Sequence, residues 1–137
     1  MQLLTPDCVG AFLERFFAFN DGLLLTVQHS YAISGEETTS VWSCVKDRDL
    51  GRSSIVLVKV HHVAEMVFRE GNHSLRVMRH GLSLDWLEGR VWLAFQPYSA
   101  EMTSVEDYRR SYFYMAGQSC SWRVEGPGDT PPSHEAG

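Results

Sequence analysis

The strongest constraint on the fold is the alternation of apolar and polar residues, with a period of two, that recurs between residues 23 and 96. Successive side chains of a β-strand point to opposite faces of a sheet, so this period is typical of half-buried strands. Short polar or glycine-containing stretches interrupt the pattern, as expected of turns. The predicted strands are residues 23–33, 41–46, 55–63, 64–69, 75–79, 82–86 and 91–96.

The character of these segments indicates how they pair. A polar connection at residues 35–40 favours a hairpin between the first two strands. Residues 55–63 are apolar on both faces, so we expect this strand in the middle of a sheet. The last three strands are short and separated by glycine turns, which indicates an antiparallel meander that ends at Pro97.

One helix is predicted on each side of the strands. Thr5 is a suitable N-cap for a helix over residues 6–19, where apolar residues recur at helical spacing. A second helix is predicted over residues 104–117, because Thr103 and Glu106 match a capping box. In this helix Val105, Tyr108, Tyr112, Met115 and Ala116 share the core face, Phe113 lies on the flank and Tyr114 faces water.

These elements predict an α+β domain. It has an N-terminal helix, a mainly antiparallel meander sheet of about six to eight strands and a second helix near the C-terminus, with residues 119–125 as a last strand. We expect one domain over residues 1–126. Residues 127–137 are rich in proline and glycine and have little to bury, so we expect a flexible tail there.

Cysteine usage and the absence of targeting signals favour a cytoplasmic protein. Cys8, Cys44 and Cys120 are an odd number of distant cysteines, which argues against a secreted disulfide framework. The N-terminus lacks the charged and apolar regions of a signal peptide, and no apolar run is long enough to span a bilayer. With a net charge of −5 and scattered basic residues, we expect no nucleic-acid binding and a preference for basic partners.

No motif in the sequence predicts chemistry. His61 and His62 are adjacent on a strand and point to opposite faces, so they are poorly placed to share a metal ion. Cys44 and Cys120 match no nucleophile signature and are interpreted as buried small hydrophobes. The serine and glycine patterns miss the hydrolase and phosphate-loop motifs. We therefore predict no catalytic residue, no metal site and no cofactor, and favour a protein that is not an enzyme.

Two groups of residues are candidates for binding a partner. The paired acids Glu36, Glu37, Asp47 and Asp49 lie in predicted polar loops, where a basic partner could dock, and the alternative is that they are solvated loop charges. Arg110, Phe113 and Tyr114 belong to a segment with more aromatic area than one helix face buries, and such residue types are enriched at interfaces. The alternative for Tyr114 is a stack on the Arg110 guanidinium.

Several short strings, in their order along the chain, carry a resemblance to a known group. They are Phe-Asn-Asp-Gly after the first helix, Val-His-His-Val-Ala-Glu-Met-Val-Phe, His-Gly-Leu-Ser-Leu and Val-Trp-Leu-Ala-Phe. Across residues 10–125 the chain resembles small bacterial α+β families that include predicted immunity proteins of polymorphic toxin systems. The resemblance implies a protein that binds a cognate toxin domain and blocks it. It assigns no residue.

Three functions follow as hypotheses. The first is a non-catalytic binding protein, an immunity-type inhibitor that occludes a toxin or effector domain, with a basic toxin domain as the expected partner. The second is a small-molecule-binding or enzymatic domain with a pocket between sheet and helix that uses His29, His61 or His62. The third is a homo-oligomeric module, for example a homodimer that pairs through an edge strand or the aromatic helix.

Overall fold

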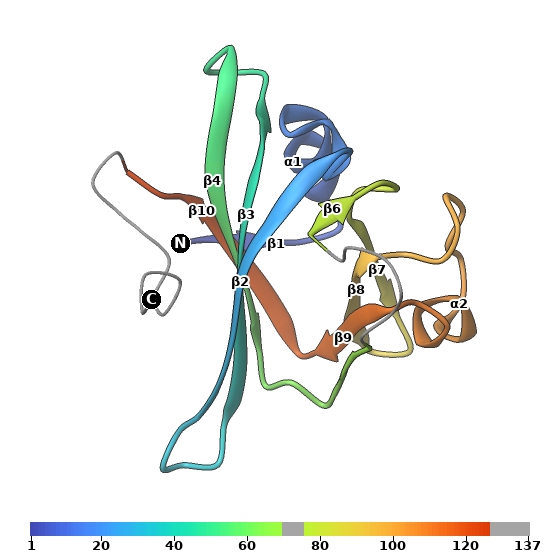
Figure 1. Cartoon of the computed structure of the whole chain (residues 1–137). Helices are drawn as coiled ribbons and strands as arrows, with labels where there is room; N and C mark the ends of the chain where they lie inside the picture. Colours follow the sequence, from blue (N-terminus) through green and yellow to red (C-terminus); the bar gives the residue numbers. More distant parts are fainter. Residues whose placement is uncertain (70–75, 127–137) are drawn as a thin grey trace.

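Ten strands and two short α-helices make up the described part of the chain, residues 1–69 and 76–126, in the computed structural model (Figure 1). The strands form two antiparallel sheets of six and four strands. The predicted α+β class is confirmed at this level, with more strands than the six to eight predicted. No helix in the described residues has the length and apolar character needed to cross a bilayer. Residues 127–137, predicted as a tail, lie outside the described residues.

The larger sheet contains the predicted hairpin and the predicted central strand. Its order in space is β1 (Gln2–Leu4), β10 (Ser119–Val124), β4 (Arg52–His61), β3 (Glu37–Asp47), β2 (Gly22–Tyr31) and β6 (Val77–Met78). β4 lies between β10 and β3, which confirms the central position predicted for residues 55–63. β2 and β3 pair along their length, up to Tyr31 opposite Glu37.

The smaller sheet corrects the predicted meander. Its order is β5 (Glu65–Phe68), β9 (Phe113–Gly117), β8 (Arg90–Gln96) and β7 (Ser83–Leu87). β7 and β8 form the expected hairpin, but β6 pairs with β2 in the larger sheet. Gly22 permits this pairing, because a Cβ there would lie 3.0 Å from the Cε of the fully buried Met78.

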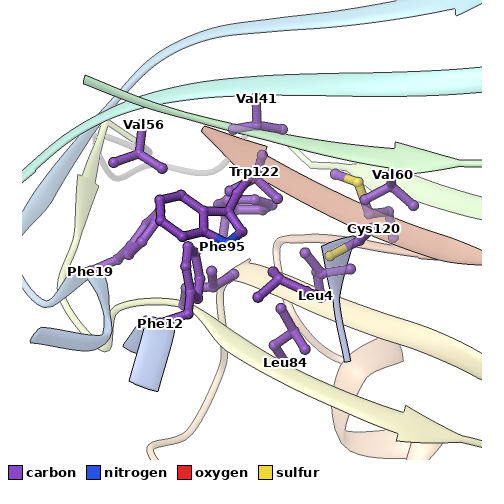
Figure 2. Close-up of a cluster of buried hydrophobic side chains, with 14 of the residues drawn as sticks. Leu4, Phe12, Phe19, Val41, Val56, Val60, Leu84, Phe95, Cys120 and Trp122 are labelled. Atoms are coloured by element: carbon purple, nitrogen blue, oxygen red, sulfur yellow. The ribbon is translucent and has the colours of Figure 1, made fainter. Parts of the chain in front are cut away.

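The main core fills the space between the inner faces of the two sheets and α1 (Val9–Arg15) (Figure 2). Alternate residues of β4, among them Val56 and Val60, point into it from the larger sheet. Phe95 of β8 enters from the smaller sheet, and the rings of Phe12 and Trp122 meet with centroids 5.0 Å apart. Because β8 and β9 are also buried on their outer faces, the smaller sheet has a second, minor core beneath α2 (Val105–Arg109).

The first helix is shorter than the predicted residues 6–19. It ends at Arg15, and Phe17, Ala18 and Phe19 have positive φ angles of 52°, 51° and 62°. Reversing the hand of the chain here leaves both Phe16 and Phe19 fully buried. The tertiary contacts of these two rings therefore outweigh the helical preference of the segment.

The second predicted helix, residues 104–117, is wrong over its C-terminal half. The capping box is present one residue later than predicted, with Ser104 and Asp107, and the helix ends at Arg109. Residues Phe113–Gly117 form β9, and all five of them are buried between β5 and β8. A strand in the middle of this sheet buries both of its faces, whereas a surface helix would bury only one face of these residues. The strand therefore wins over the helical spacing of the sequence.

Candidate partner-binding surface

The distal half of the β2–β3 hairpin projects away from both cores (Figure 1). Its end, residues 31–37, is called the hairpin tip below. The tip is closed by hydrogen bonds from the Ala32 amide to the Glu36 carbonyl and from the Gly35 amide to the Ala32 carbonyl, with Gly35 at φ 92°. Tyr31 is 73% exposed and Ile33 is fully exposed, so the tip presents two large apolar side chains to water.

Two acids of the hairpin tip, Glu36 and Glu37, lie close to histidines. Glu36 Oε1 lies 3.7 Å from His62 Nε2, and Glu37 Oε1 lies 3.7 Å from His29 Nε2. The other ring nitrogen of His29 is 2.6 Å from the Thr39 hydroxyl. Both carboxylates are partly exposed, so the tip combines apolar groups with negative charge. Glu36 occupies the predicted polar loop, whereas Glu37 is the first residue of β3.

A polar hollow of about 330 Å³ adjoins the tip on the outer face of the larger sheet. Its lining includes Gln28, Glu36, Lys59 and His61. The imidazole Nε2 of His61 is 3.0 Å from the Ser121 hydroxyl. Burial, followed by the positive charge of Lys59, lowers the pKa of His61 below its usual value. The hollow thus offers one ammonium group, one carboxylate and several hydrogen-bonding groups.

Asp47 and Asp49 are not part of this surface, because they lie at the opposite end of β3. The Asp47 side chain has no exposed area and accepts two 3.0 Å hydrogen bonds from the Arg15 guanidinium and one of 2.9 Å from the Ser54 hydroxyl. The bonds from Arg15 lower the Asp47 pKa. The interpretation of Asp47 as a solvated loop acid is therefore wrong, since this carboxylate links α1 to the sheet. Asp49 is exposed in the following turn, 3.4 Å from Arg15.

The two aromatic candidates, Phe113 and Tyr114, lie in the core, because the segment predicted as an exposed helix forms the buried strand β9. Phe113 is fully buried and Tyr114 is 4% exposed, so the predicted solvent exposure of Tyr114 is wrong. The Tyr114 hydroxyl donates to Glu65 Oε2 at 2.7 Å, and burial together with this carboxylate raises the pKa of Tyr114 to about 12. Tyr114 stacks on Trp92, while the Arg110 guanidinium lies over the Tyr98 ring on the surface.

The two apolar residues of the hairpin tip were missed by sequence reasoning. The period of two places Tyr31 and Ile33 on the buried face of the predicted strand 23–33, and both are exposed. The hairpin extends beyond the region that the smaller sheet and α1 cover, so its inner face has no core to join. The nearby turn residues Gly35 and Glu36 were the available signal that the strand ends in water.

The described residues hold no cluster of three or more His, Cys, Asp or Glu side chains that could bind a metal ion. Cys120 is buried, as predicted, and burial raises the pKa of its thiol to about 12, whereas Cys44 is half-buried. A hollow of about 340 Å³ between α1 and β10 is lined by Phe12, Arg15 and Trp122 and by none of the three histidines suggested for a pocket between sheet and helix.

The fold and surface define a class: an antiparallel two-sheet α+β domain with a projecting, acidic and apolar hairpin tip beside a polar hollow. Comparisons with protein-family models, curated proteins and solved structures find no match to the chain.

Proposed function

We propose that this chain is a non-catalytic binding protein, an immunity-type inhibitor that occludes a cognate toxin or effector domain through the hairpin tip. The observation that carries the proposal is the exposure of Tyr31 and Ile33 at the end of a projecting hairpin. Tyrosine is enriched at interface hot spots, and burying one large apolar side chain contributes about 1.5–3 kcal/mol. Binding a partner buries the apolar area that both side chains expose to water.

Charge supports a basic surface on the partner. Glu36 and Glu37 follow the two apolar residues in the hairpin, with Glu37 directly opposite Tyr31, and the whole chain carries a net charge of −5. Charges around an apolar centre accelerate association and select the partner more than they add affinity. Of the four acids predicted to bind a partner, the proposal includes only Glu36 and Glu37. Asp49 and Arg110 are exposed but lie away from the tip, and Asp47, Phe113 and Tyr114 are buried.

The test is co-purification of the full chain with the product of the neighbouring gene, followed by titration of the complex. Tyr31→Ser combined with Ile33→Ser is expected to weaken binding at least 100-fold, about 2.7 kcal/mol. The Leu3→Ser variant is the matched control, because Leu3 is an exposed apolar residue on β1, far from the tip. No complex, or equal affinity for the double variant and the control, would refute the proposal.

A second candidate function is the binding of a small polar molecule in the hollow of about 330 Å³. Lys59 supplies a positive charge and Gln28 an amide there, which suits an organic anion. Titration with small carboxylic acids, followed by NMR, distinguishes the two functions. Lys59→Met should abolish binding of such an acid, and Ile33→Ser should leave it unchanged, because Ile33 does not line the hollow whereas Tyr31 does. Light scattering of the wild type tests the third hypothesis, a homodimer.

A further inference from the structure

The outer edge of β2 is covered by another strand over only part of its length. β6 pairs with the first two residues of β2, and just beyond them the Leu24 amide donates to the Arg76 carbonyl at 2.6 Å. Past Leu24, no strand in the described part of the chain pairs with β2 on this side. Residues 26–31, in the projecting half of the hairpin (Figure 1), are called the open edge below.

At every second residue of the open edge, the backbone groups point away from β3. Tyr31 lies opposite Glu37, and the Glu37 carbonyl accepts a 2.9 Å hydrogen bond from the amide of Val63, which follows β4. The Tyr31–Glu37 pair is therefore of the kind that exchanges no hydrogen bonds, and both residues direct their backbone groups outward. Because β2 and β3 keep one register along the open edge, the same holds for Val27 and His29.

The open edge lacks the features that usually protect the edge of a sheet. Charged side chains, proline and bulges discourage pairing between strands of different chains. The sequence between Gly22 and Gly35 contains no Asp, Glu, Lys, Arg or Pro, and the register shift of β2 lies near Leu25, before the open edge begins. Tyr31, at the end of the open edge, is 73% exposed. Such an edge favours pairing with another strand.

Charge favours a second copy of this chain as the source of that strand. Each copy carries a net charge of −5, so two copies approach one another with least repulsion along a stretch without charge. Antiparallel pairing of two open edges also puts the two hairpin tips, with Glu36 and Glu37, at opposite ends of the paired stretch. It uses the open edge of both copies at once, so the assembly closes at two chains.

We propose that two copies of this chain pair antiparallel through their open edges, about a two-fold axis at His29. This register gives every outward-facing residue a hydrogen-bonded partner, with Val27 opposite Tyr31 of the second copy and His29 opposite its own counterpart. Tyr31 then packs on a β-branched side chain, which is a favourable cross-strand pair. On the other face, Gln28 of each copy lies opposite Ser30 of the other.

This inference does not depend on the proposed function, because it concerns the chain alone. Tyr31 belongs both to the hairpin tip and to the open edge, whereas Ile33 lies beyond the paired stretch. A toxin domain seated over Tyr31 would displace the second copy. The dimer is therefore the form of the chain without a bound partner.

Sedimentation velocity of the full chain across micromolar concentrations should show a monomer–dimer equilibrium. Gln28→Glu combined with Ser30→Glu sets like charges opposite one another, and Gln28→Glu combined with Ser30→Lys sets opposite charges there. Both positions are exposed, so the two double variants should melt at similar temperatures. The first should dimerise at least tenfold more weakly than the second. A wild type that stays monomeric, or equal dissociation constants in the two double variants, would overturn the proposal.

Disulfide cross-linking tests the register in a Cys8→Ser background, which removes the exposed native thiol. A mixture of Gln28→Cys and Ser30→Cys chains should form mixed dimers on oxidation, because opposite residues of this kind have Cα atoms about 4.5 Å apart. Gln28→Cys alone should cross-link far less, since an axis at His29 sets two copies of residue 28 on a diagonal. Ser53→Cys, exposed near the start of β4, is the control. Equal yields in the mixture and in either single variant would refute the assigned pairing.

Discussion

At the scale of single residues, close backbone contacts restrict which amino acid a position accepts more tightly than hydrophobicity does. Gly81 has φ +70°, and a Cβ there would lie 2.0 Å from the Ala18 carbonyl oxygen. The Asp47 carboxylate is an acid in a polar stretch of sequence that the fold uses as a buried anchor for Arg15. In both cases the constraint comes from a residue distant in sequence, so neighbouring residues do not reveal it.

Gly81→Ala is expected to destabilise the protein strongly. The new Cβ combines the strain of positive φ with a collision against the Ala18 backbone, and together these should cost about 3 kcal/mol or more. Gly51→Ala is the matched control: its φ is +65°, but a Cβ there meets nothing within 4 Å, so about 1–2 kcal/mol is expected. Urea unfolding measures both. Equal losses would show that the left-handed turn at residues 17–19 does not contact Gly81.

At the scale of elements, the short helix α2 is stabilised mainly by the side chains that cap its N-terminus. Asp107 accepts hydrogen bonds from the backbone of Thr103 and Ser104 and from the Tyr98 hydroxyl, and these lower its pKa to about 2. A carboxylate with a lowered pKa stabilises the folded state above its unfolded pKa and loses this effect as the pH falls through its folded value. The helix therefore owes part of its stability to one ionised group.

This pKa predicts a pH window. The stability difference between the wild type and Asp107→Asn should be constant above about pH 4 and should shrink between about pH 4 and pH 2. Thermal melts followed by circular dichroism across this range measure the difference. Glu106→Gln, in the same turn, is the control and should have little effect. Carbon NMR that finds the Asp107 carboxyl titrating near its ordinary pKa would contradict the prediction.

At the scale of the whole molecule, the two sheets share one core, and the chain passes from one sheet to the other four times, between β4 and β5, β5 and β6, β6 and β7, and β9 and β10. Two of these crossings lie together, the one from β4 to β5 and the one from β9 to β10 through Gly117, where a Cβ would lie 2.6 Å from Val60 Cγ1. The Gln118 amide donates to the His61 carbonyl, which joins the two crossings. Neither sheet keeps its inner face covered without the other.

The shared core predicts a single unfolding transition. The four tryptophans report on both sheets, since Trp42 and Trp122 lie in the larger sheet and Trp86 and Trp92 in the smaller one. With 5-fluorotryptophan incorporated, all four fluorine NMR signals should lose intensity at one urea concentration. Earlier loss of the Trp86 and Trp92 signals would show that the smaller sheet unfolds independently.

The sequence by itself determined the strands between residues 22 and 96 and the last strand, the first hairpin and the central position of β4, but neither β1 nor β9. These features depend on alternation and turn residues that act over a few positions. Glu36 was also placed correctly in a polar loop, because a turn is local. Only the tertiary structure decided that residues 113–117 are a strand, that Asp47 is buried and that Phe17 is held outward. Each of these depends on burial or strain set by residues far along the chain, and a local period cannot encode which surface a distant segment will cover.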